Sequence, residues 1–221
     1  MLAAKLKEIK DEIYNYKWKI IESPVDLEGD SNFEKNISLK ENLSKDVNLE
    51  AHFAWIVNTW GGIKNFNVNE NRNKIQKFLF YLEKNKGLPK SLMDVISSLS
   101  KIASFKNPKK YCIYDSRAIF SLNWLLIKYS DTNLLFPQPK GRGLSTEIDV
   151  STLLKFTKKE YSWYSEKIAY YKYCELMEEL TFQVFEESNK PYYTEMLLFV
   201  IAETNGFINQ DLRKSVKVII E

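Results

Sequence analysis

The stretch SSLSKIASFKNPKKYCIYDSRAIFSLNW, residues Ser97 to Trp124, joins a lysine-rich turn to an aspartate and an apolar segment. Ala118–Ile127 is apolar nearly all round, which is typical of a central buried helix. Asp115 stands just before it, where a carboxylate accepts backbone N–H groups of the first turn and complements the helix dipole. The stretch therefore predicts a helical core, with Asp115 as the cap of its central helix.

Helical spacing of apolar residues recurs along most of the chain, and no strand-like alternation persists. The polar, acidic segment 25–46 is the exception. It is expected to be a long and mobile surface connection, with at most a short element near Ile37. The expected helices are 2–23, 48–60 with Asn48 as cap, 71–85, one from Pro89 onward with a break or tight turn within 97–100, 118–127, one or two within 151–187, and 191–206.

These patterns predict an all-α fold, a compact helical bundle. With 221 residues the chain is long enough for one sizeable core. We therefore expect 1–221 to form a single helical domain, or two lobes with the functional site between them near 97–124. No apolar run approaches the roughly 18 residues of a membrane span, and charges occur throughout the first 21 residues. The expectation is a cytoplasmic monomer that does not bind membranes.

The supply of metal ligands is small. Two cysteines, Cys112 and Cys174, and one histidine, His52, are too few for the usual zinc sites or an iron–sulfur cluster. We expect no cofactor or metal, a half-buried structural role for His52, and chemistry based on Lys, Asp, Glu or Tyr. The net charge of +3 does not by itself indicate nucleic-acid binding.

Tyrosines are concentrated near the C-terminal third, where five of the 13 lie between Tyr161 and Tyr173. Aromatic side chains at this density can stack on bases. A tyrosine-rich helix of a large helical protein more often packs, with the hydroxyl groups reaching its edge. Packing is the favoured interpretation.

The opening stretch also resembles the core of the helix-hairpin-helix DNA glycosylase superfamily. It is most similar to a group of short prokaryotic proteins related to 8-oxoguanine DNA glycosylases. The similar residues are Ser100, Lys101, Phe105, Asn107, Pro108, Tyr114, Asp115, Ser116 and Arg117, and a looser likeness covers Asn48–Ile63 and Pro191–Thr204. Unlike the family's hairpin, Ser97–Tyr111 contains no glycine.

The resemblance implies an enzyme that flips a damaged or modified base out of double-stranded DNA and excises it, with possible lyase activity through a Schiff base. Lys101 matches the family's lysine nucleophile. Asp115 matches the aspartate that stabilises positive charge on the sugar and accepts a proton. From the residues alone, Asp115 is explained as an ordinary cap and Lys101 as a solvated lysine. The cap and catalytic roles of Asp115 are compatible.

A lysine nucleophile must be neutral, so its pKa has to fall from about 10.4 through burial or nearby cations. Candidate cations are Lys106, Lys109 and Lys110. These three lysines and Arg117 are also interpreted as contacts to DNA phosphates or as solvated charges. Lys140 and Arg142, in the basic loop Pro137–Gly143, are candidates for a second phosphate contact.

Three hypotheses follow. The first is a DNA glycosylase-like enzyme in base excision, in either DNA repair or antiviral defence. The second is a DNA-binding protein of the same scaffold without catalysis, and the third is a helical protein that binds a protein partner through exposed aromatic residues. Four aromatic residues remain unranked as stacking groups: Phe53, Trp55, Trp60 and Tyr114.

Overall fold

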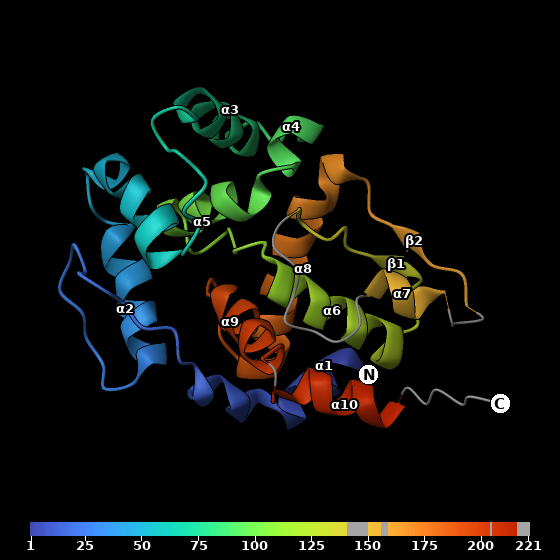
Figure 1. The fold of residues 1–221 in the computed structure, drawn as a ribbon. Coiled ribbons are helices and arrows are strands. Elements are labelled where there is room, and N and C mark those ends of the chain that lie inside the picture. The colour runs from blue at the N-terminus through green and yellow to red at the C-terminus, as the bar shows by residue number, and fades with distance from the viewer. Residues whose placement is uncertain (141–149, 156–158, 204, 216–221) are drawn as a thin grey trace.

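The computed structural model describes residues 1–140, 150–155, 159–203 and 205–215. Helices dominate this part of the chain (Figure 1), which confirms the all-α prediction. The α-helices are α1 (Leu2–Glu8), α2 (Asn32–Leu43), α3 (Arg72–Glu83), α4 (Lys90–Met93), α5 (Ile96–Lys106), α6 (Ser116–Tyr129), α7 (Val150–Leu154), α8 (Glu166–Phe185), α9 (Tyr192–Ile201) and α10 (Phe207–Ser215). Two 3-10 helices, η1 (Lys10–Asn15) and η2 (Leu49–His52), and a π-helix, η3 (Trp55–Trp60), complete the helical part. The two-residue strands β1 (Leu134–Leu135) and β2 (Ser162–Trp163) pair in parallel.

The prediction of a central buried helix is confirmed. In α6 every side chain from Ala118 to Leu126 is buried. The helix packs against α9 and α1, and α9 packs in turn against α8 (Figure 1). Asp115 caps α6, since its Oδ1 accepts hydrogen bonds from the backbone N–H groups of Arg117 at 2.9 Å and Ala118 at 3.0 Å. The start of the core helix is therefore fixed by the residue that the sequence indicates.

The expectation of a mobile connection over 25–46 is wrong, because this segment contains the 12-residue helix α2. Ser31 begins it with a capping box: its Oγ accepts the N–H of Glu34 at 3.1 Å, and the Glu34 carboxylate accepts the N–H of Ser31 at 2.9 Å. Phe33 and Leu39 are buried on its inner face. A narrow apolar stripe between many polar residues is enough to bury this helix.

Three other predicted helices differ from the structure. The N-terminal helix ends at Glu8 and continues only as η1, which ends at Asn15. The chain after it is not helical, and the indole N–H of Trp18 there donates to the carbonyl of Trp60 at 2.9 Å. The predicted break within 97–100 lies earlier, at Asp94–Val95 between α4 and α5. Asn48 makes no side-chain cap bond, and the segment after it forms η2 and η3 instead of one α-helix.

The segment 151–187 contains α8 as its one long helix in the described part, preceded by β2. Its tyrosines confirm the packing interpretation for the two buried ones, Tyr170 and Tyr173. Within the described ranges, no helix combines the length and the apolar character that crossing a membrane requires.

Candidate active site

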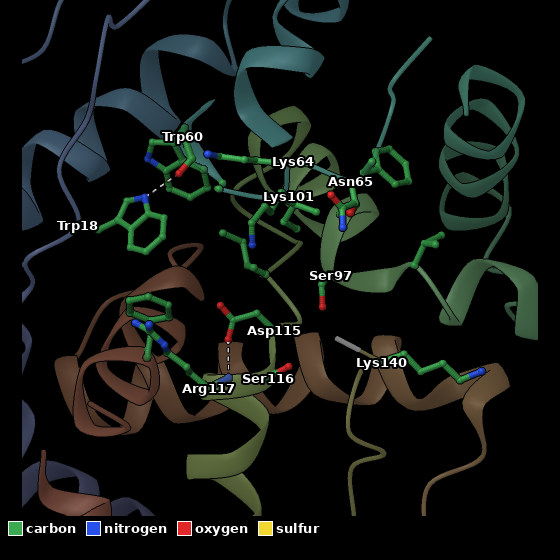
Figure 2. Close-up of a pocket in the computed structure, with 18 of the residues that line it drawn as sticks. Trp18, Trp60, Lys64, Asn65, Ser97, Lys101, Asp115, Ser116, Arg117 and Lys140 are labelled. Carbon is green, nitrogen blue, oxygen red and sulfur yellow. Dashed lines mark hydrogen bonds between the residues drawn. The ribbon is translucent and has the colours of Figure 1, made fainter. Parts of the chain in front are cut away.

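Lys101 and Asp115 line one pocket of about 560 Å³. Its walls come from the segment after η1, the turn that follows η3, the beginning of α5, the segment that leads into α6, and α9. Figure 2 shows Lys101 and Asp115 facing each other across the hollow. The volume falls in the range of about 300–1,000 Å³ that small-molecule sites occupy.

Lys101 lies in the middle of α5 and not at a helix start, because the helix already begins at Ile96. Its side chain is 6% exposed, so the interpretation as a solvated lysine is wrong. Burial lowers the pKa of its ammonium group, and the nearby cations Lys40 and Arg117 lower it further, whereas Asp115 and Glu195 act in the opposite direction. A lysine in such surroundings is poised to lose its proton and become a nucleophile.

Asp115 presents its carboxylate at the N-terminus of α6. Both capping hydrogen bonds end on Oδ1, so capping occupies only one of its two oxygens. The same carboxylate stabilises the charged form of Lys101. Asp115 therefore caps α6 and also lines the pocket.

Hydrogen bonds from α5 fix where Asp115 stands relative to Lys101. The hydroxyl of Ser97 donates to the carbonyl of Tyr114 at 3.3 Å, and the N–H of Tyr114 donates to the hydroxyl of Ser100 at 2.9 Å. Tyr114 directly precedes Asp115, and Ser100 directly precedes Lys101. Ser97 and Ser100 thus connect α5, which carries Lys101, to the segment that carries Asp115.

The rest of the segment before Asp115 is held by buried side chains. Tyr170 and Tyr173, on α8, donate their hydroxyl groups to the carbonyls of Cys112 and Ile113, each at 3.0 Å. The N–H of Ile113 donates to Glu195 at 3.3 Å. This non-helical backbone is therefore buried with polar groups satisfied, as stability requires.

A second charged pair lies beneath the pocket. The amine of Lys40, on α2, is 3.7 Å from a carboxylate oxygen of Glu195, on α9, and both side chains are almost completely buried. The amine also lies 5.1 Å from the ring centre of Phe105 and 5.7 Å from that of Trp60. Burial raises the pKa of Glu195, and Lys40 counteracts this shift. Glu195 also lines the pocket, so this pair connects the core to the site.

Aromatic side chains form another wall of the pocket. Trp18 packs edge-to-face on Trp60, with ring centres 6.3 Å apart, and on Phe199 at 5.6 Å. Asn36 holds the indole of Trp60 and the backbone of Trp18: it accepts the Trp60 indole N–H at 2.9 Å and donates to the Trp18 carbonyl at 2.8 Å. The guanidinium of Arg117 lies 4.8 Å from the ring centre of Phe199. The pocket thus offers flat apolar faces beside charged groups.

Gly61 ends the π-helix η3 against the side chain of Lys101. A Cβ atom at this position would lie 2.6 Å from Cδ and 2.7 Å from Cε of Lys101. π-Helical turns are rare and frequently occur at functional sites. The stem of Lys101 is therefore packed against backbone, which restricts where its amine can go.

The basic residues predicted to take part in the site do not all lie at the pocket. Arg117 lines the pocket, as does Lys140, which extends away from Lys101 (Figure 2) and pairs with Asp94 at 2.8 Å. Lys106, Lys109 and Lys110 are exposed at or beyond the end of α5 and do not line the pocket. The suggestion that they lower the pKa of Lys101 is wrong, because Lys40 and Arg117 are the cations that do so. Arg142 lies outside the described residues.

The four candidate stacking residues lie in different places relative to the pocket. Trp60 lines the pocket, and Phe53, Trp55 and Tyr114 do not. Tyr114 is fully buried and donates its hydroxyl to the carbonyl of Pro137 at 2.7 Å. His52 is half-buried and lies 2.9 Å from Asp46, which confirms its structural interpretation.

The chain matches no protein-family model, no curated protein and no solved structure. Its site is therefore interpreted from its own geometry. Among the described residues, no three His, Cys, Asp or Glu side chains gather in an arrangement that could hold a metal ion. What the pocket does contain is the buried amine of Lys101, the three carboxylates of Asp94, Asp115 and Glu195, and Arg117, with aromatic rings along one wall. This set suits nucleophilic attack by an amine on an electrophilic carbon, with a carboxylate beside it to stabilise positive charge.

Proposed function

We propose that this protein is a DNA glycosylase-like enzyme that excises a damaged or modified base from duplex DNA, with Lys101 as the nucleophile and Asp115 as charge stabiliser and proton acceptor. The single observation that carries the proposal is the meeting of these two side chains in one pocket, with Lys101 buried and its pKa lowered. The resemblance of Ser97–Trp124 to the helix-hairpin-helix glycosylases points to the same two residues.

The proposed reaction begins with a nucleotide extruded from the duplex into the pocket. The lone pair of the neutral Lys101 amine attacks C1′ of the sugar, and the bond from C1′ to the base nitrogen breaks. The base leaves with the bonding electrons and takes up a proton from water. Asp115 stabilises positive charge on the sugar and then accepts a proton from the new ammonium group. The lone pair of the Lys101 nitrogen then breaks the C1′–O4′ bond, O4′ takes up the proton from Asp115, and a Schiff base between Lys101 and C1′ results.

The surroundings of the two residues suit this chemistry. Trp18, Trp60 and Phe199 line the pocket, and aromatic side chains are what proteins use to hold unpaired bases. Arg117 and Lys140 place positive charge around the pocket, where a phosphate backbone would pass. Salt-dependent affinity for duplex DNA is the expected consequence.

The proposal is tested by incubating the protein with duplex DNA that contains an abasic site, under borohydride. We expect a covalent complex for the wild type and none for Lys101→Gln, while the matched control Lys45→Gln, at an exposed lysine outside the pocket, traps normally. A panel of oxidised, alkylated and hypermodified duplexes then identifies the base released. Salt-dependent DNA binding without trapping or base release would favour the non-catalytic DNA-binding alternative, and absence of DNA binding would refute both.

A further inference from the structure

The charges around Lys101 come from several different elements. Lys40 comes from α2, Arg117 from α6, Asp115 from the cap of α6, and Glu195 from α9. Other titratable groups lining the same pocket are Tyr16, Lys64, Asp94 and Lys140, of which Asp94 and Lys140 pair with each other at 2.8 Å. The pKa of Tyr16 is raised by burial and by the two carboxylates, so Tyr16 stays neutral.

The inner group is already balanced without Lys101. Two carboxylates, Glu195 and Asp115, face two cations, Lys40 and Arg117. Lys40 is paired with Glu195 at 3.7 Å, and Arg117 is permanently charged. A proton on Lys101 would therefore be a surplus positive charge in a buried place, where an unpaired charge is costly. The neutral amine is the form that leaves the group balanced.

We propose that the buried ion pair between Lys40 and Glu195 keeps Lys101 in its neutral, nucleophilic form, by giving Glu195 a counter-ion other than Lys101. Lys40 and Glu195 are in this sense positioning residues, which act on the proposed nucleophile without themselves reacting. The catalytic meaning of the inference rests on the proposed function. The charge balance itself is a property of the free protein and is measured without DNA.

Removal of the two partners has opposite consequences. In Lys40→Met the carboxylate of Glu195 loses its cation, and a proton must enter the group. It goes to Lys101, because the proton affinity of a lysine exceeds that of a carboxyl group by about six pKa units in reference compounds. In Glu195→Gln an anion that holds the proton on Lys101 disappears. The pKa of Lys101 should therefore rise in the first variant and fall in the second, consistent with the directions in which the two groups act on it.

The experiment measures the rate at which Lys101 is methylated by formaldehyde and cyanoborohydride as a function of pH. Peptide mass spectrometry follows Lys101, and the exposed Lys109 in the same digest is the internal reference for the reagent. We expect the midpoint for Lys101 to rise by about one pH unit or more in Lys40→Met, to fall in Glu195→Gln, and to return toward the wild-type value in the double variant. The control Lys45→Met, an exposed lysine just after α2, should leave it unchanged.

A merely structural ion pair would give a different result. Loss of packing alone would expose Lys101 in either single variant and move both midpoints in the same direction, toward that of an ordinary lysine. Equal directions, or a midpoint unchanged in Lys40→Met, would overturn the inference. Circular dichroism checks that each variant is folded. If Lys40→Met does not fold, the isosteric Glu195→Gln decides, and a midpoint that fails to fall refutes the inference. Because no DNA is used, failure of the glycosylase proposal would appear separately, as absence of trapping.

Discussion

The contact between Gly61 and Lys101 allows a sharp test of the site, through the variant Gly61→Ala. The added Cβ would lie 2.6 Å from Cδ of Lys101 and 2.7 Å from the backbone carbonyl oxygen of Ile56. Non-bonded carbon atoms prefer separations of about 3.5–4.0 Å. The stem of Lys101 must withdraw by roughly 1 Å to restore an ordinary contact distance. The turn at the end of η3 must also shift, because the carbonyl oxygen of Ile56 belongs to its backbone.

A displacement of this size at a reacting atom costs about 100-fold in rate, which corresponds to about 2.7 kcal/mol in the activation barrier. We therefore expect Gly61→Ala to reduce the single-turnover rate of borohydride trapping on abasic-site duplex by about two orders of magnitude. The fold should survive, because overpacking typically costs about 1–3 kcal/mol. Urea unfolding measures that cost in the same preparation.

The neighbouring glycine supplies the matched control. Gly62 has a φ of +66°, and a Cβ placed on it would meet only Trp18, at 3.9 Å. Gly62→Ala should therefore lose about 1–2 kcal/mol through the left-handed backbone conformation and still trap at close to the wild-type rate. If a folded Gly61→Ala traps as fast as the wild type, or if both variants slow trapping equally, the packing of Lys101 against Gly61 does not position its amine.

Three further predictions concern charged groups of the site. Asp115→Asn should change the free energy of unfolding by less than about 1 kcal/mol, because asparagine caps about as well as aspartate. The same variant should reduce the rate of base release by about 10²–10³-fold, because the negative charge is lost. Base release at the wild-type rate would contradict the catalytic role. Lys101→Met should stabilise the protein at neutral pH, since the lowered pKa of Lys101 means that the unfolded chain binds the extra proton. The gain in the free energy of urea unfolding should shrink as pH rises from the lowered pKa of the folded state toward 10.5, the ordinary pKa of lysine, and a pH-independent gain would argue for an ordinary lysine. Changing Lys140 and Arg142 together to alanine should weaken binding equally for unrelated duplexes and reduce the salt slope by about 2, whereas an unchanged slope would remove both residues from the DNA interface.

Local signals account for what the sequence predicts correctly. The cap at Asp115 and the buried helix α6 depend on neighbouring residues, so both can be recognised from a short stretch. The helix α2 was harder to recognise from the sequence, because its narrow apolar stripe is interrupted by polar residues. Phe33, Leu39 and Leu43 stand among lysines, glutamates and asparagines that obscure the helical period. The capping box of Ser31 and Glu34 was the signal that could have identified its start.

The pair between Lys40 and Glu195 depends on contacts between elements far apart in the chain, which periodicity does not reveal. For each of the two residues, however, one feature of the sequence indicated a buried charge. Glu195 is the only charged residue in the apolar helix α9, and Lys40 directly follows the buried Leu39 on α2. A charge inside an apolar helix predicts a buried partner, since buried charges are paired or carry function. The sequence does not show that the partner lies on α2.

The cost of these buried charges bears on what they are for. An apolar pair at positions 40 and 195 would be as stable as the ion pair or more so, because desolvation offsets most of the attraction between buried charges. Stability therefore does not explain why this core holds Lys40 and Glu195 next to a further lysine. Strongly perturbed ionisable groups in a cleft are typical of functional sites. Within the inner set, the ion-pair contact found among the described residues joins Lys40 to Glu195, and the amine of Lys101 faces the pocket outside that pair. Under the proposed function, the reactivity of the Lys101 amine explains why the core accepts this cost, which the stability of the fold does not explain.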